Sequence, residues 1–230
     1  MGLRTILRKL LKYEQPSVFL NESYSQEGED GILNRIFEHK QTGFFVDVGA
    51  LHPIRFSNTY KFYKKGWRGI NIDALPGSME AFKQLRPLDI NLEVPISNEK
   101  NTIPFYVFKE KALNTFSPEV VEDRAKNGYQ IERVIHVETN TLSNILDRYL
   151  PASTKIDFLT IDAEGFDFKV LQSNNWQNYR PDIVLLESEL QILDFMNSDM
   201  YHFMQGNHYT IYAKSVKTYF LKNDDLKIYF

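Results

Sequence analysis

Hydrophobic residues follow two different periods along this chain, and the changes between them mark its elements. Short, nearly continuous apolar runs of the kind found in buried parallel strands alternate with segments that have helical spacing. The pattern predicts strands at 44–49, 68–73, 90–96, 103–108, 156–162 and 183–187. It predicts helices at 27–39, 57–65, 76–85, 142–149 and 166–171. Two further runs, 209–213 and 218–222, are expected to form a terminal hairpin.

Strands that alternate with helices indicate an α/β fold. We expect a doubly wound, Rossmann-like, mostly parallel sheet with helices on both faces and antiparallel C-terminal strands. The 230 residues fit one domain, 1–230. Residues 109–130 are polar, contain Pro118 and Gly128, and are predicted to form an irregular functional loop or lid.

Residues 1–12 have the spacing of an amphipathic basic helix, which Pro16 ends. We expect this segment, 1–16, to pack on its own domain; the alternative is peripheral contact with an anionic membrane. No apolar run approaches the roughly 20 residues that a bilayer requires. The absence of cysteine and of an evident secretory signal favours a cytoplasmic protein.

Composition narrows the chemistry further. The net charge is −3, so the chain lacks the broad basic surface typical of nucleic-acid binding. The lack of cysteine excludes disulfides, thiolate metal sites and a thiol nucleophile.

Acidic residues stand at or near the ends of four predicted strands. These are Asp47, Asp73, Asp162 and Glu187, and Glu164 follows closely. Ligands of open parallel sheets bind outside the carboxyl ends of the strands. We therefore expect these acids to surround a single crevice.

The turn after the first predicted strand indicates which nucleoside this crevice binds. An acid that ends the second strand, here Asp73, is suited to bind ribose hydroxyls. Dinucleotide folds need several glycines after the first strand, but only Gly49 is present, and no P-loop sequence occurs. A nucleoside without phosphates needs fewer glycines. S-adenosylmethionine is such a nucleoside, and acids would attract its ammonium and sulfonium groups.

Several motifs resemble those of the FkbM-type methyltransferases, in family order over roughly residues 23–222. The matching stretches are Ser25-Gln26-Glu27-Gly28-Glu29-Asp30, Phe45-Val46-Asp47-Val48-Gly49-Ala50, Gly66-Trp67-Arg68-Gly69-Ile70-Asn71-Ile72-Asp73, residues 156–165 with Ile161-Asp162-Ala163-Glu164-Gly165, and Pro181-Asp182-Ile183-Val184-Leu185-Leu186-Glu187. The resemblance implies a class I methyltransferase fold and O-methylation, often of sugars or polyketides. After the first motif this chain has His52-Pro53 and Phe56-Ser57-Asn58-Thr59, where other members have Asn-x-Gly.

The resemblance also implies a set of residues that bind S-adenosylmethionine. Asp47 would hold the ammonium group, and Asp73 the ribose. The other residues of this set are Gly49 and Ala50 near the amino-acid end, Gln26, Glu29 and Asp30 closing over it, Asn58 after the first motif, Ala74 beside the adenine, Ser97 and Asn98 at the adenine edge, and Asp162. Helix capping is the alternative role for residues 26–30, and an ordinary turn for 97–98.

Methyl transfer to a hydroxyl requires a base that removes the acceptor's proton. Asp162, Glu164 and His52 are the candidates, because crowded carboxylates raise one another's pKa and histidine titrates near neutrality. Alternatively, Asp162, Glu164 and Glu187 could bind Mg²⁺ or another divalent cation. Pairing of these acids with Arg or Lys, and a packing or capping role for His52, are the structural alternatives.

The sequence thus predicts a methyltransferase that acts on a sugar hydroxyl of a nucleotide sugar, glycan or glycosylated metabolite. The partner is then a sugar or glycan acceptor rather than nucleic acid. A non-catalytic nucleoside-binding domain of the same fold is the main alternative. A nicotinamide oxidoreductase is disfavoured by the missing glycines. The sequence does not determine the oligomeric state.

Overall fold

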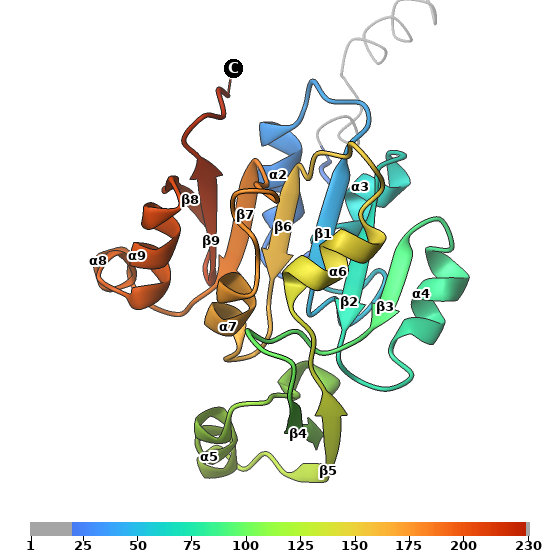
Figure 1. Cartoon of the computed structure of the whole chain (residues 1–230), viewed down its shortest axis with the longest axis vertical. Helices are drawn as coiled ribbons and strands as arrows, with labels where there is room; N and C mark the ends of the chain where they lie inside the picture. Colours follow the sequence, from blue (N-terminus) through green and yellow to red (C-terminus); the bar gives the residue numbers. More distant parts are fainter. Residues whose placement is uncertain (1–19, 229–230) are drawn as a thin grey trace, which may run out of the picture.

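A computed structural model describes residues 20–228 of the chain. The amphipathic helix predicted at 1–16 lies outside the described residues. At the centre is a seven-stranded sheet in the order β3-β2-β1-β6-β7-β9-β8 (Figure 1). Its strands are β1 (Phe44–Val48), β2 (Arg68–Asp73), β3 (Ile90–Glu93), β6 (Phe158–Ile161), β7 (Ile183–Glu187), β8 (Tyr209–Lys214) and β9 (Thr218–Asn223). β1, β2, β3, β6 and β7 are parallel, whereas β8 and β9 are antiparallel, so the predicted fold class is confirmed.

Alternate side chains of the central strands supply two separate cores. Val46 and Val48 pack with residues of α6 (Leu142–Tyr149), α7 (Asp167–Gln172) and α9 (Asp199–Gly206) on one face. Phe45 and Phe158 pack on the opposite face with α2 (Glu29–Ile36) and α3 (Tyr60–Lys64). Both faces are therefore apolar and covered, as a doubly wound sheet requires (Figure 1).

A small lobe protrudes below the sheet in Figure 1 and departs from the sequence prediction. It contains β4 (Thr102–Phe108), η2 (Lys111–Leu113), α5 (Pro118–Lys126) and β5 (Ile131–Glu138), and β4 and β5 form a two-stranded sheet of their own. Residues 109–130 are thus not an irregular loop. Ser117 caps α5 by accepting a hydrogen bond from the Val120 N–H, and Pro118 occupies the first turn.

Other differences concern short elements. The prediction missed β5, α8 (Ile192–Met196) and α9, and it made the helix at 27–39 too long. Gly28 occupies the N-cap position of α2, and the Ser25 hydroxyl accepts a hydrogen bond from the Asp30 N–H at 3.2 Å. α4 (Met79–Leu85) begins three residues later than predicted. Between residues 20 and 228 no helix is long and apolar enough to cross a bilayer.

The strand register places the functional edge of the sheet. Val48 of β1 pairs with both Ile72 of β2 and Ile161 of β6, and Ile161 pairs with Leu186 of β7. The residues that follow these four positions therefore lie at one level, at the carboxyl end of the parallel strands. They are Gly49, Asp73, Asp162 and Glu187.

Candidate active site

A large cavity opens at this carboxyl edge, between the sheet and the β4–β5 lobe. Its volume is about 1180 Å³, ample for a nucleoside cofactor together with a second small molecule. Carboxylates outnumber basic side chains among its lining residues by ten to five. The predicted site residues that line it are Gln26, Glu29, Gly49, His52, Asn58, Asp73, Ala74, Asp162, Glu164 and Glu187.

Asp73 is fixed in this cavity by the backbone of two turns. Its carboxylate accepts hydrogen bonds from the Leu51 N–H at 3.0 Å and the Leu75 N–H at 2.8 Å. Each carboxylate oxygen keeps a further acceptor site for a ligand hydroxyl. Burial raises the pKa of Asp73, and the two backbone N–H groups oppose that rise.

Gly49 allows the turn after β1 to lie against the end of β6. Its φ is +87°, and an added Cβ would lie 1.7 Å from the Asp162 carbonyl oxygen. Any side chain here would therefore force the backbone apart. The Gly49 and Ala50 N–H groups both donate to the Ile72 carbonyl, which fixes the same turn to β2.

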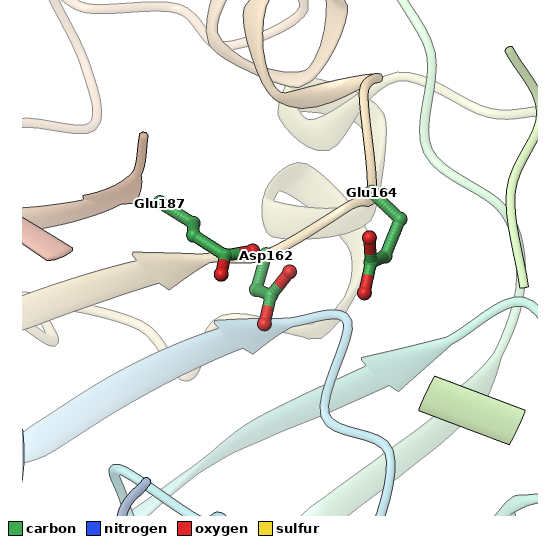
Figure 2. Close-up of side chains that lie close together, drawn as sticks. All are labelled: Asp162, Glu164 and Glu187. Carbon is green, nitrogen blue, oxygen red and sulfur yellow. The ribbon is translucent and has the colours of Figure 1, made fainter. Parts of the chain in front are cut away.

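Three carboxylates converge at the ends of β6 and β7. One oxygen from each of Asp162, Glu164 and Glu187 lies within 4.8 Å of the others (Figure 2). Asp162 is exposed to the cavity but surrounded by protein, and this desolvation raises its pKa well above the usual value. The negative charges of Glu187 and Glu164 raise it further. The Asp162 carboxylate is therefore a stronger proton acceptor than that of an ordinary aspartate.

Two residues that the sequence did not single out organise the loop that carries Glu164. Arg124, from α5, forms an ion pair with Glu164. Burial raises the pKa of Glu164 to about 7, and the Arg124 guanidinium opposes that rise. Asp167 accepts hydrogen bonds from the Ala163 and Gly165 N–H groups at 3.0 and 3.1 Å. Burial raises the pKa of Asp167 to about 6. The sequence offered one signal for Asp167, because it is an acid in the first turn of a predicted helix. It offered no signal for Arg124.

His52 lines the cavity but is not arranged as a base. Its Nδ1 accepts hydrogen bonds from the Ile54 N–H at 3.0 Å and the Arg55 N–H at 2.9 Å. A neutral imidazole that accepts at Nδ1 carries its proton on Nε2, so neither nitrogen is free to take another. Burial and Arg55 lower the pKa of His52. These contacts favour the packing or capping role of His52 over the role of a base.

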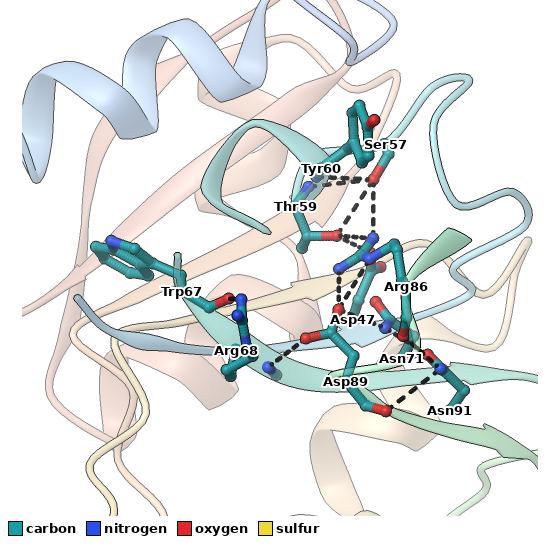
Figure 3. A network of polar contacts seen from close by, with 11 residues as sticks. Asp47, Ser57, Thr59, Tyr60, Trp67, Arg68, Asn71, Arg86, Asp89 and Asn91 are labelled. Carbon is teal, nitrogen blue, oxygen red and sulfur yellow. Dashed lines mark hydrogen bonds and ion pairs between the residues drawn. The ribbon is translucent and has the colours of Figure 1, made fainter. Parts of the chain in front are cut away.

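Asp47 is not a lining residue of the cavity, contrary to the expectation that all four strand-end acids surround it. It precedes the last residue of β1, so its side chain belongs to the sheet face that carries Phe45. There it accepts a hydrogen bond from the Thr59 hydroxyl at 2.9 Å, near the guanidinium of Arg86 (Figure 3). Arg86 is fully buried and pairs with Asp89 at 2.7 Å.

Asp47 gives a testable pH dependence of stability. Burial raises its pKa from 3.8 to about 6, and Arg86 and Thr59 oppose that rise. The folded chain then binds this proton more tightly than the unfolded chain, so the stabilisation exists below about pH 4 and is lost as pH rises towards 6. Relative to Asp47→Asn, the wild-type free energy of unfolding should fall by up to about 3 kcal/mol between these limits.

Urea denaturation of both proteins from pH 4 to pH 7 measures this difference. Glu80→Gln, at an exposed position of α4, is the control and should show no comparable trend. A constant difference between wild type and Asp47→Asn would show that Asp47 titrates normally.

The two acids in the first turn of α2, Glu29 and Asp30, form hydrogen bonds within the protein. The Asp30 carboxylate accepts hydrogen bonds from the Tyr24 N–H at 2.8 Å and the Ser23 hydroxyl at 2.6 Å, and it does not line the cavity. Glu29 touches the cavity, but its carboxylate accepts from the hydroxyls of Ser215 and Thr218. Glu29 and Gln26 therefore lie in the lining, whereas Asp30 lies outside it and its carboxylate is taken up by contacts within the protein.

Three further predicted residues lie outside the cavity. Ala50 is buried against α4, in a small cluster with Met79 and Phe82. Ser97 is buried and its hydroxyl donates to Asn98, which lies near Gln172. The wall at this point consists instead of Val94, Pro95 and Ile96. Asn58 remains in the lining, where its amide donates to the Thr160 hydroxyl at 3.0 Å.

This arrangement suits a cationic nucleoside and a reaction that requires a base. An anchored carboxylate ends β2, and a cluster of protonatable carboxylates ends β6 and β7. Ala74, Leu75 and Phe105 add an apolar wall between them. The two polar regions thus lie in one cavity with an apolar surface suitable for a flat ring.

The comparisons with known proteins agree with this geometry. The family model described as methyltransferase FkbM domain matches residues 47–211. Comparison with curated proteins gave no match, and comparison with solved structures gave none either. The matched segment includes the ends of β1, β2, β6 and β7, which build the cavity. Since it covers well over half of the chain, this protein belongs to the FkbM family of methyltransferases.

Proposed function

We propose that this methyltransferase uses S-adenosylmethionine and transfers its methyl group to a sugar hydroxyl, with Asp162 as the base. The observation that carries this proposal is the anchored Asp73 in the same cavity as the Asp162 cluster. When bound, S-adenosylmethionine supplies a methyl group on a sulfonium, which needs little activation. The protein must then orient the acceptor and accept its proton.

The residues present fit this cofactor at both ends. Asp73 has free lone pairs for the ribose hydroxyls, and Ala74 and Leu75 offer an apolar surface to the adenine. The excess of carboxylates in the lining favours a ligand with a net positive charge. Gln26 and Asn58 supply amide groups for its amino-acid end.

Asp162 is the best-placed base among the three candidates. His52 has its Nδ1 occupied, and Glu164 is paired with Arg124. Asp162 has no basic partner among the described residues, and its raised pKa makes the carboxylate a stronger proton acceptor than an ordinary aspartate.

Divalent-cation binding by Asp162, Glu164 and Glu187 is a second use of the same cluster. Three carboxylate oxygens within 4.8 Å suit a hard cation such as Mg²⁺. The guanidinium of Arg124 on Glu164 adds a positive charge beside the cluster and weighs against a cation there. We therefore assign the cluster to proton transfer and leave the metal as an outcome of the test below.

A sugar acceptor is supported by the remaining walls of the cavity. The lobe contributes Phe116 and Tyr129, whose rings can pack on the faces of a pyranose, and the acids can accept hydrogen bonds from its hydroxyls. The deciding experiment is methyl transfer from labelled S-adenosylmethionine to a panel of nucleotide sugars, glycans and glycosylated metabolites. EDTA should leave turnover unchanged; loss that Mg²⁺ restores would assign the cluster to a metal.

Cofactor binding has its own prediction. Asp73→Ala should weaken binding of S-adenosylmethionine by about 100-fold, because the ribose would lose hydrogen bonds to a charged group. Isothermal titration calorimetry measures this effect directly. Asp123→Ala, which removes an acid of the lobe side of the cavity, is the matched control and should bind nearly as wild type.

The outcomes separate the competing hypotheses. Normal affinity in Asp73→Ala would remove the ribose assignment. Cofactor binding without transfer to any acceptor of the panel would favour the non-catalytic nucleoside-binding domain.

A further inference from the structure

Ser78 is at the N-cap of α4, but its side chain does not cap the helix. A serine at this position ordinarily accepts a hydrogen bond from a backbone N–H of the first turn. Ser117, Thr141 and Ser198 do so at the starts of α5, α6 and α9. Ser78 has helical backbone angles instead, with φ −61° and ψ −33°, and its hydroxyl makes no hydrogen bond to the N–H groups of the first turn.

The Ser78 hydroxyl is buried without a hydrogen bond of normal geometry to any described residue. A buried hydroxyl without a partner is costly, and such groups are rare in folded proteins. Ser78 therefore has the backbone angles of a helical residue, and its hydroxyl is left without a partner of normal geometry. Such a local cost is characteristic of functional sites.

The location of Ser78 indicates what the hydroxyl serves. Ser78 belongs to the cavity lining and lies close enough to Asp73 for its hydroxyl to help lower the pKa of that carboxyl. The turn between them is fixed, because the Leu75 N–H donates to Asp73 and the Gly77 N–H donates to Glu93 at 2.7 Å. This fixed turn therefore holds the Ser78 hydroxyl beside the Asp73 carboxylate.

We propose that Ser78 is a positioning residue for the nucleoside, whose hydroxyl hydrogen-bonds Asp73 when the ribose of the cofactor engages that carboxylate. The Asp73 carboxylate would then accept hydrogen bonds from two backbone N–H groups, the Ser78 hydroxyl and the ribose hydroxyls. A carboxylate has about four acceptor sites, so two of these donors would share one site. Before binding, the poorly bonded hydroxyl costs stability; after binding, it orients the carboxylate. This inference rests on the proposed binding of S-adenosylmethionine at Asp73.

The test measures binding of S-adenosylhomocysteine to the full chain by calorimetry, which needs no acceptor. Ser78→Ala should weaken binding about three- to tenfold, the effect of one neutral hydrogen bond. Ser78→Thr keeps the hydroxyl and should restore most of the affinity. In an Asp73→Asn background, Ser78→Ala should change the affinity little further, because the residue acts through the carboxylate.

Ser198, a serine that does cap its helix, provides a control in which the opposite effects on stability and binding are expected. Ser198 caps α9 by accepting from the Tyr201 N–H at 3.2 Å, and it is not a lining residue of the cavity. Ser198→Ala should lower the melting temperature by about 2–4 °C and leave the affinity unchanged. Ser78→Ala should do the reverse, with an unchanged or raised melting temperature and weaker binding.

Three results would overturn the inference. Wild-type affinity in Ser78→Ala shows that the hydroxyl has no role in binding. An equal loss in the wild-type and Asp73→Asn backgrounds shows that it does not act through the carboxylate. A drop in melting temperature like that of Ser198→Ala shows an ordinary structural role. Normal affinity in Asp73→Ala would instead contradict the proposed function itself.

Discussion

Asp162→Asn is expected to lower kcat by about 10² to 10⁴-fold while S-adenosylmethionine still binds with nearly normal affinity. The asparagine keeps the size of the side chain but cannot accept the acceptor's proton. Cofactor affinity should persist because the ribose contact lies at Asp73, on a different strand. Transfer from labelled cofactor measures turnover, and calorimetry measures binding.

The same substitution should make the folded protein more stable, which separates loss of catalysis from loss of structure. Asp162 lies among Glu187, Glu164 and Asp167, and each of these negative charges raises its pKa. Removing one charge relieves that repulsion, so the melting temperature should rise. Glu189→Gln, at the exposed rim where Glu189 pairs with Lys217, is the control for removing an acid and should retain activity. Wild-type turnover in Asp162→Asn would exclude Asp162 as the base.

Arg86→Met is expected to destabilise the protein by about 3–5 kcal/mol, the largest stability effect that we predict. Arg86 is fully buried, bonds the Thr59 hydroxyl at 2.9 Å and pairs with Asp89 (Figure 3). Its removal would leave Asp47 and Asp89, both buried, without their cation. For a chain of this length the melting temperature should fall by about 10 °C.

Lys83→Met provides the matched control on the same helix. Lys83 is exposed and pairs with exposed Glu80, so this substitution should cost less than about 1 kcal/mol. Adding Asp89→Asn to Arg86→Met should recover part of the stability, because it removes one of the two orphaned charges. A loss in Arg86→Met no greater than that in Lys83→Met would refute the role of this network.

The sequence predicts the central elements well because their signals are local. The strands at 68–73 and 183–187 and the helix at 142–149 have the predicted bounds, and a local cap, Thr141, begins that helix. The lobe was missed in part because β4 and β5 pair across more than twenty intervening residues. β5 is exposed along most of its length, so it lacks the apolar run by which buried strands are recognised.

The hydrophobic pattern alone determined the alternating layers of this protein, and the acids at strand ends determined which edge of the sheet holds the site. Side-chain direction and long-range partners were decided only by the tertiary structure. Asp47 and Asp162 both follow apolar strand residues, yet one packs beside Arg86 and the other lines the cavity. Asp47 lies one residue before the end of β1, whereas Asp162 is the first residue after β6. A shift of one residue along a strand turns the side chain to the opposite face of the sheet. Arg124 reaches Glu164 from a separate lobe, and no local pattern encodes such a contact.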